Sequence, residues 1–475
     1  MLKREESNQY LTMIRTGQTM TLQQQVRLTL MLSLPSILAQ ITHILMQYID
    51  ASMVGGLGAQ ATASIGLVST TIWLFSGLAS ASSSGFSVQV AHCIGANDIS
   101  RARNVFRQSI TSTMLFSLTL TTIALCIAPS LPHWLGGGDD IVGDASRYFL
   151  IFAACIPAMQ TNHLCASMLR CSGNMFVPSM LNILMCVLDV IFNFFFIFPS
   201  REVSLLGMEL FVPGAGLGVV GAALGTAVAE WITALLMAYF ALVRSSELSL
   251  TKERGSFRPT WRVVQKALRI GVPMGCQHIL FCGAQITSTI IVAPLGTFSI
   301  AANSLAITAE SICYMPGYGI SDAATTLVGQ SIGAGRHDLT WRFSKITLSL
   351  GIGIMTLMGV VMFFAAPYMM GMMTPVEEVR QLGTAALRIE AFAEPMFAAS
   401  IICYGIFVGA GDTLVPAMMN LGSIWLVRIT LAALLTPSLG LNGAWIAMCI
   451  ELCVRGVIFL VRLRQGKWLK GSVTS

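Results

Sequence analysis

Long apolar runs alternate with short polar connections along almost the whole of this 475-residue chain. Twelve of the runs are long enough to cross a bilayer as helices, since a transmembrane helix needs about 20 mostly apolar residues. Their apolar cores cover residues 28–54, 62–90, 108–130, 148–169, 176–198, 216–243, 264–294, 298–331, 343–369, 383–409, 413–437 and 441–463. The pattern predicts an all-α polytopic membrane protein with twelve transmembrane helices.

Polar residues interrupt the first apolar run with a helical period. They recur at steps of four, three, four and three residues: Ser36, Gln40, His43, Gln47 and Asp50. This spacing places all five on one face of a helix. A carboxylate near the middle of a bilayer costs about 2.5 kcal/mol or more, so we expect Asp50 to face water, a partner group or a transported ion. Pro35 lies in the same run and removes one backbone hydrogen bond, which predicts a hinge.

The second half of the chain repeats the first at an offset of 238 residues. The matching pairs are Pro35 and Pro273, Gln47 and Gln285, Gly58 and Gly296, Gly95 and Gly333, Pro157 and Pro395, Gly173 and Gly411, Pro178 and Pro416, and Asn182 and Asn420. Six helices per half let both halves enter the membrane in the same sense, so the predicted pseudo-twofold axis runs along the membrane normal. We expect an N-terminal segment (1–27), a bundle (28–243), a cytoplasmic linker (244–262), a second bundle (263–464) and a tail (465–475).

The repeat fails at a few costly residues, and these failures indicate function. Asp50 corresponds to Ser288, Asp189 to Val427 and Asn193 to Leu431. The run 176–198 carries its own polar stripe at steps of four, three and four: Asn182, Cys186, Asp189 and Asn193. Two buried carboxyl groups that lie close together raise each other's proton affinity. Such a pair predicts a site for a proton or for a small hard cation.

Composition and charge support a membrane protein and indicate its orientation. Apolar residues make up 55% of the chain and charged residues 11%, and the mean hydropathy is +0.73. Lys and Arg are concentrated before residue 28, in the even-numbered connections and in the tail, which predicts cytoplasmic termini in the plasma (inner) membrane. The net charge of +6 therefore reflects topology and predicts no nucleic-acid partner. The twelve cysteines lie in or beside apolar runs and suggest neither disulfides nor a metal site.

Sequence motifs give no support to an enzyme. The chain contains no GxxxxGK[ST] or HExxH sequence, and its one GxSxG match, Gly329 to Gly333, ends an apolar helical run and forms no strand-to-helix nucleophile turn, so neither a nucleotide-driven pump nor a membrane protease is indicated. Further charged residues lie within apolar runs: Glu230, Glu310, Glu390, Glu394, Arg428 and Glu451. An intramembrane Arg428 needs an acidic partner, and an ion pair with one of these acids is the default expectation. The roles of Glu390, Glu394, Glu451 and Arg428 stay open at this point.

Several motifs together resemble a known family. They are Asp50, Val54, Gly55 and Gly58, then Gly95-Ala96-Asn97-Asp98, its echo Val328 to Gly335, the stretch Leu169 to Asn174 with Pro178, and Gly409 to Thr413 with Pro416. The chain resembles a multidrug and toxic compound extrusion (MATE) transporter from about Leu28 to Arg464. The resemblance implies a monomeric antiporter that exchanges protons or sodium ions for bulky, often cationic drugs, with no other cofactor.

The resemblance also distinguishes two branches by their acids. Phe281 and Phe397 occupy the places of the acids typical of the NorM-like branch, whereas the DinF-like pattern falls on Asp50, Asp189, Asn193 and Thr226. It implies that these four residues bind the coupling cation, which is either a proton or Na⁺. We expect the substrate cavity to include Gln40, His43, Gln47, Asn182, Gln285 and Glu310. Two alternatives stay open: an exporter of a specific metabolite such as a flavin, and a flippase for lipid-linked precursors, which would need a cationic cavity.

Overall fold

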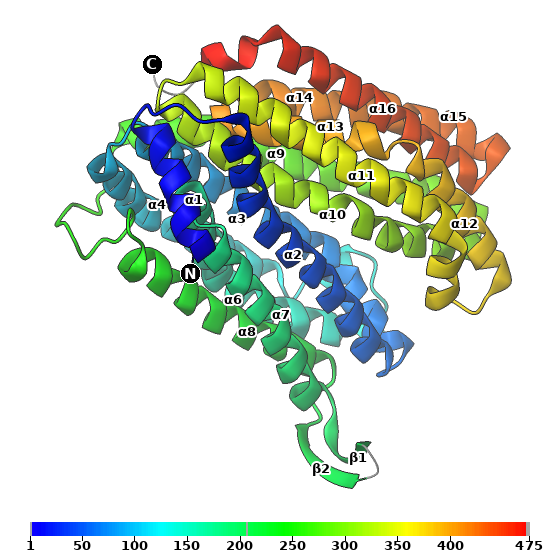
Figure 1. Cartoon of the computed structure of the whole chain (residues 1–475). Coiled ribbons are helices and arrows are strands. Elements are labelled where there is room, and N and C mark those ends of the chain that lie inside the picture. Colours follow the sequence, from blue (N-terminus) through cyan, green and yellow to red (C-terminus); the bar gives the residue numbers. More distant parts are fainter. Residues whose placement is uncertain (1, 206–207, 472–475) are drawn as a thin grey trace.

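The computed structural model describes residues 2–205 and 208–471, and these residues are almost entirely helical (Figure 1). The first half contains α1 (Leu2–Arg15), α2 (Leu22–Gly55), α3 (Ala59–Gly95), α4 (Ile99–Ile127), α5 (Leu131–Trp134), α6 (Asp139–Cys171), α7 (Phe176–Ile197), β1 (Pro199–Leu205), β2 (Met208–Ala215), α8 (Val219–Tyr239) and η1 (Phe240–Arg244). The second half contains α9 (Trp261–Val292), η2 (Ala293–Leu295), α10 (Thr297–Gly333), α11 (His337–Met373), α12 (Glu377–Ala391), α13 (Glu394–Ala410), α14 (Leu414–Gly422), η3 (Ser423–Ile429), α15 (Thr430–Leu439), α16 (Leu441–Gln465) and η4 (Lys467–Gly471).

Each predicted apolar segment falls on one helix or on helices that follow one another directly, which confirms the all-α polytopic class. By length and apolar composition, ten helices of the described residues can cross a membrane, or eleven when the pair α12 and α13 counts as one span. The 37-residue α10 is as long as α11 but is richer in Ser and Thr and carries Glu310 and Asp322. Some helices begin before their apolar cores, at residues that cap them. Asp98 precedes α4 and is one example, because its side chain accepts a hydrogen bond from the backbone N–H of Arg101 in the first turn.

Each half contains hydrophobic clusters of its own, and the two halves also pack against each other. One cluster around Phe149 contains residues of the first half only. Another around Trp445 contains residues of the second half only. Between the halves, α2 packs against α10 and α3 packs against α9. These contacts place the first two helices of each half at the centre of the molecule, so the polar face of α2 lies close to both halves.

Two elements were not predicted from the hydrophobic pattern. The strands β1 and β2 form an antiparallel hairpin that projects from the end of the molecule opposite the C-terminus (Figure 1). The predicted N-terminal segment folds into α1, and α2 starts at Leu22, where Thr21 and Gln24 form a capping box. Both elements are too polar or too short to appear as apolar runs. Residues 472–475 of the predicted tail lie outside the described residues.

One predicted span of the second half is broken. The helices α12 and α13 meet at 60°, with Pro395 in the first turn of α13. A proline at this position lacks the N–H that would continue α12 and fits the start of a new helix. The break leaves Glu390 at the end of α12 and Glu394 at the start of α13.

Candidate cation site

The site begins where the polar face of α2 meets α7. The amide Nδ2 of Asn193 donates to Asp50 Oδ1 at 3.0 Å and to Asp189 Oδ2 at 3.4 Å. Asp189 and Asn193 are 0% and 2% exposed, and Asp50 is partly buried. One amide thus bridges two carboxyl groups that come from helices far apart in the sequence. The i, i+4 spacing of Asp189 and Asn193 is what brings both to the same face of α7.

Helix α8 closes the site from another side. The Thr226 hydroxyl lies beside the Asp189 carboxyl group. A Cβ added to the neighbouring Gly225 would lie 2.1 Å from Asn193 Oδ1, so only glycine lets α7 and α8 approach this closely. The structure therefore brings together all four residues expected to bind the coupling cation: Asp50, Asp189, Asn193 and Thr226.

Two buried oxygen atoms of this group accept no hydrogen bond from the described residues. They are Asp189 Oδ1 and Asn193 Oδ1. Buried oxygens without a donor are costly and rare in folded proteins. Carboxylate, amide and hydroxyl oxygens are the ligands that hard cations prefer, and a proton on one carboxyl group would also relieve the charge pair. The residues fit either a proton or Na⁺.

The polar stripe of α2 continues away from this group. Gln47 and His43 are exposed and lie 3.3 Å apart between Nε2 atoms, whereas Gln40 is half-buried. His43 is also close enough to Asp189 for an electrostatic interaction. Pro35 lies inside α2, which runs unbroken from Leu22 to Gly55. The stripe thus links the acid pair to a solvent-accessible face of the helix.

The other residues expected in the substrate cavity lie in three places. Asn182 is half-buried on α7, on the same face as Asp189 and about two turns before it. Gln285 of α9 is exposed and borders a small pocket of about 210 Å³ with Ser69, Thr70 and Trp73 of α3. Glu310 of α10 lies apart from these residues and is only 5% exposed.

Glu310 belongs instead to a group of three buried glutamates. Carboxyl oxygens of Glu310, Glu390 and Glu394 lie within 4.8 Å of one another. Glu390 and Glu394 are both 0% exposed, and none of their four carboxyl oxygens has a hydrogen-bond partner within the described part of the chain. The sequence indicated the individual acids, but only the structure shows that Glu390 and Glu394 lie beside Glu310.

The expected partner of Arg428 is Glu451. Arg428 Nη2 lies 2.7 Å from Glu451 Oε2, and Arg455 Nε lies 2.7 Å from the other oxygen of the same carboxylate. Ser423 donates to Glu451 as well, at 2.6 Å. This network satisfies the intramembrane cation within the second bundle.

Sequence reasoning missed two polar contacts at the centre of the molecule. Arg170 Nη1 of α6 lies 3.8 Å from Asp322 Oδ2 of α10, and the Ser36 hydroxyl donates to the same oxygen at 3.2 Å. In the first bundle, Asn162 Nδ2 donates to Glu230 Oε1 at 2.9 Å. The position of Ser36 on the polar stripe of α2 was a signal for the first contact, but its partners come from other helices.

A family model described as MatE matches residues 35–195 and 273–434 of this chain. The chain belongs to the MATE family. The probable multidrug resistance protein NorM of Thermotoga maritima is 25% identical over 450 residues, which cover 93% of each chain. The protein of the same name from Idiomarina loihiensis is 24% identical, and the match covers 91% of this chain and 92% of the relative.

Solved MATE structures have the same fold. A crystal structure of MATE in complex with MaL6 matches with a TM-score of 0.87 at 20% identity, over 97% of this chain and 99% of that chain. A structure described as the outward-facing conformation of a multidrug resistance MATE family transporter matches with a TM-score of 0.85 at 21% identity, over 94% and 97% of the two chains. Family membership and the membrane-length helices make this protein a multi-pass membrane protein of a transporter family.

The two segments that match the MATE family model correspond to the two copies of the internal repeat. Its two segments begin at Pro35 and Pro273, and 273 − 35 gives the offset of 238 seen in the sequence. The acid pair lies in the first matched segment, whereas Phe281 and Phe397 stand in the second. Among the acids of the described residues, this MATE protein thus concentrates one group around Asn193 and another around Glu390.

Proposed function

We propose that this protein is a cation-coupled antiporter that exports bulky, cationic amphipathic compounds across the inner membrane by alternating access. The observation that carries the proposal is the bridge from Asn193 to both Asp50 and Asp189. It supports a site where one cation neutralises a buried acid pair. The names of the relatives, probable multidrug resistance proteins, support drugs as the exported class.

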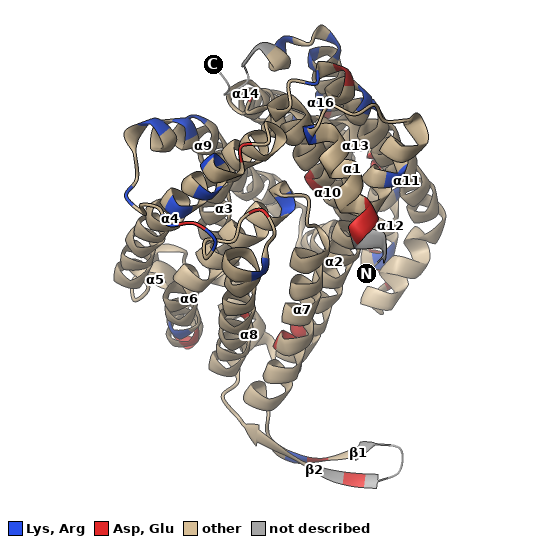
Figure 2. Cartoon of the chain, turned by 60° about the vertical axis from the view of Figure 1, so that its left-hand side comes forward, with Lys and Arg blue, Asp and Glu red and all other residues tan. Residues whose placement is uncertain are grey.

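The charge distribution supports an orientation with both termini in the cytoplasm. Figure 2 shows Lys and Arg gathered at the end of the molecule where α4 and α9 begin and α16 ends, with few in the middle. Positive residues favour the cytoplasmic side of a membrane. The hairpin β1–β2 then lies outside the cell. In this orientation, 28–243 and 263–464 act as the two moving bundles of one monomer, joined by 244–262.

The transport cycle follows from the chemistry of the site. A proton or Na⁺ arriving from outside neutralises the pair Asp50 and Asp189, which removes the penalty for burying two like charges. Helix α2 can then shift at Pro35, where one backbone hydrogen bond is missing. The shift narrows the space beside the stripe of α2 and expels the drug outward. The cation drives this change only because it binds one state better than the other.

The surfaces near the site suit flat organic cations. Trp73 of α3 is 60% exposed and borders the pocket that includes Gln285. An exposed indole attracts cations through its ring face, and an amide adds a hydrogen-bonding group. We place the drug along the faces of α2, α3 and α9. We infer a cation site of the DinF-like rather than the NorM-like pattern, because the acids lie around Asn193. The relatives named above carry the name NorM.

The test is accumulation of ethidium inside everted membrane vesicles, or its movement across proteoliposome membranes, under separately imposed proton and sodium gradients. The wild-type protein should move the dye with one gradient, and Asp50→Asn should abolish coupled movement while expression and thermal stability stay unchanged. Asp140→Asn is the matched control, because Asp140 is exposed and accepts a hydrogen bond from the exposed side chain of Gln60. Its transport should equal that of the wild type.

Either of two results would overturn the proposal. Full coupled efflux by Asp50→Asn would remove the acid pair from the coupling step. Failure of the wild-type protein to move any cationic dye under either gradient would point to a metabolite exporter or to a lipid-linked precursor flippase instead.

A further inference from the structure

Helix α1 packs between the two bundles at the end of the molecule that carries most of the Lys and Arg residues. Its side chains Tyr10, Leu11 and Ile14 are 9%, 1% and 0% exposed. They belong to one hydrophobic cluster with residues of both halves: Met20, Leu28, Leu32 and Met175 from the first, and Ala323, Leu327, Leu339 and Phe343 from the second. The helix is thus buried against both bundles at once. A polar, surface-lying segment would not bury these side chains.

Arg15, the last residue of α1, forms hydrogen bonds with residues of both bundles. Its side chain is only 8% exposed and lies 3.3 Å from Glu247 Oε1. It also donates to the backbone carbonyl of Ser172 at 3.2 Å and to Gln330 Oε1 at 3.5 Å. One buried guanidinium therefore contacts the linker, the turn after α6 and the end of α10.

Glu247 moves with the first bundle, because the linker is tied to α4. Arg103 donates to the backbone carbonyl of Glu247 at 2.8 Å and pairs with Glu253 at 2.8 Å. The Gln108 side chain accepts from the backbone N–H of Thr260 at 2.9 Å. Two partners of Arg15, Glu247 and Ser172, are therefore fixed to the first bundle.

Other partners of α1 and of the turn that follows it belong to the second bundle. Gln330 lies on α10, and its Nε2 donates to the carbonyl of Cys171 at 2.8 Å. Arg336, ahead of α11, donates to the carbonyl of Gln18 at 2.6 Å and to that of Met13 at 3.3 Å. These bonds hold the end of α1 and the following turn against the second bundle. Separation of the bundles at this end must break contacts on one side of α1.

The backbones of the two bundles also touch directly at this level. A Cβ added to Gly95 would lie 2.1 Å from the Gln330 carbonyl oxygen, and one added to Gly333 would lie 2.1 Å from the His92 carbonyl oxygen. This end of the molecule is therefore closed in the structure. Alternating access requires it to open in another state of the cycle.

We propose that α1 is a latch that holds the cytoplasmic ends of the two bundles together and must release one of them before the transporter opens inward, with Arg15 as the residue that fastens it. The proposal rests on the transport cycle proposed above. Charge-assisted hydrogen bonds each contribute about 1.5–3 kcal/mol. Loss of the Arg15 contacts should therefore shift the closed–open equilibrium by at least about tenfold toward the inward-open state.

A native cysteine can report this opening. Cys171 is 4% exposed at the contact with Gln330, whereas Cys403 is 0% exposed in the core of the second bundle. The purified full-length protein in nanodiscs would be treated with a charged maleimide, and modification of each cysteine would be followed by peptide mass spectrometry. Arg15→Ala should raise the modification rate of Cys171 about tenfold and leave that of Cys403 unchanged. Arg15→Lys, which keeps one charge contact, should give an intermediate rate.

The matched control is Arg27→Ala. Arg27 also pairs with a residue of α1, Glu6, at 2.9 Å, but its side chain is 56% exposed and both partners lie in the first half. It should leave the rate at Cys171 unchanged. The latch is refuted if Arg15→Ala modifies Cys171 at the wild-type rate, or if both Arg15 variants accelerate Cys171 and Cys403 equally, which would show a purely structural role. Absence of gradient-driven ethidium efflux by the wild type would reject the proposed transport instead, and this measurement is independent of the labelling.

Discussion

Replacement of Glu451 by Gln is expected to destabilise the second bundle strongly. Glu451 is 0% exposed and accepts from Ser423 Oγ, from Nε and Nη2 of Arg428 and from Nε and Nη2 of Arg455, at 2.6–3.0 Å. Gln keeps the shape but removes the charge, and its amide N–H group faces the guanidinium donors. Two largely buried cations then lack their counter-charge, which costs about 3–5 kcal/mol.

This loss is large compared with the net stability of a folded protein, about 5–15 kcal/mol. Thermal unfolding in detergent, followed by tryptophan fluorescence, should show a Tm lowered by at least about 5 °C. Trp445 is 2% exposed on the same helix, α16, and is a suitable reporter. Glu451→Gln combined with Arg428→Met should recover part of the loss, since the second change removes one of the unpaired cations.

The matched control is Glu377→Gln. Glu377 pairs with Arg380 at 2.6 Å, but the two side chains are 67% and 37% exposed. Exposed pairs contribute about 0–1 kcal/mol, so the Tm should change by no more than about 2 °C. A Tm of Glu451→Gln as close to the wild type as that of the control would refute the reasoning, because it would mean that the buried network carries no net stability.

Two further predictions concern transport. Asn193→Leu installs the residue found at the equivalent position of the second half, Leu431, and removes the amide that bridges the acid pair; coupled ethidium efflux should fall at least about tenfold, and unchanged efflux would contradict a role of the bridge. Gly333→Ala places a Cβ about 2 Å from a backbone carbonyl, so the closed end should part and maleimide modification of Cys171 should accelerate. Gly353→Ala, with nothing within 4 Å of its Cβ, is the control and should match the wild type.

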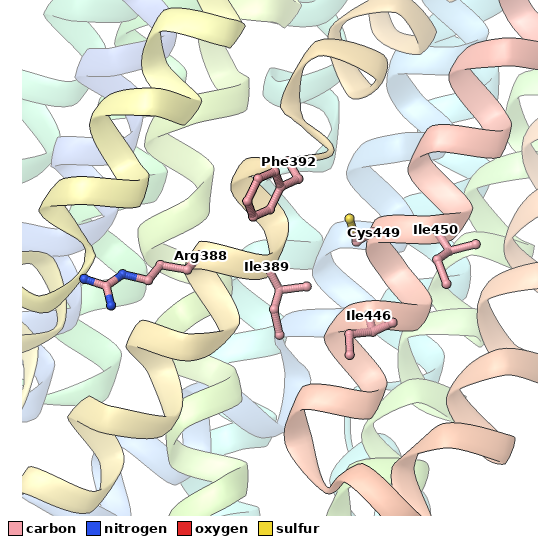
Figure 3. Close-up of a pocket in the computed structure, with 6 residues that line it drawn as sticks. All are labelled: Arg388, Ile389, Phe392, Ile446, Cys449 and Ile450. Atoms are coloured by element: carbon pink, nitrogen blue, oxygen red, sulfur yellow. The ribbon is translucent and has the colours of Figure 1, made fainter.

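The second bundle contains an apolar groove that the hydrophobic pattern of the sequence did not predict. Figure 3 shows Ile389 and Phe392 facing Ile446 and Cys449 across this groove, while Arg388 points away from it. The groove has a volume of about 230 Å³ and follows from the break between α12 and α13. In the sequence, Ile389 and Phe392 belong to one continuous apolar run, residues 383–409. A 60° bend therefore cannot be derived from hydrophobicity alone.

The candidate site could be predicted in part because its members lie on periodic stripes. Asp50 and Asp189 were identifiable because the repeat lacks them in the second half and because an intramembrane acid is costly. For Glu310, the sequence and the structure indicate different neighbours. The sequence suggested the substrate cavity, and the structure places this residue with Glu390 and Glu394 inside the second bundle.

The sequence by itself determined the helical class, the order of the apolar spans, the repeat and the polar face of α2, because these depend on local periodicity and on the cost of polar groups in a membrane. Only the tertiary structure decided which faces meet. It joined α2 to α7 at Asn193, turned Glu394 toward Glu310 and folded α1 between the bundles through Arg15. These contacts depend on how helices distant in the sequence pack, and no local pattern specifies that.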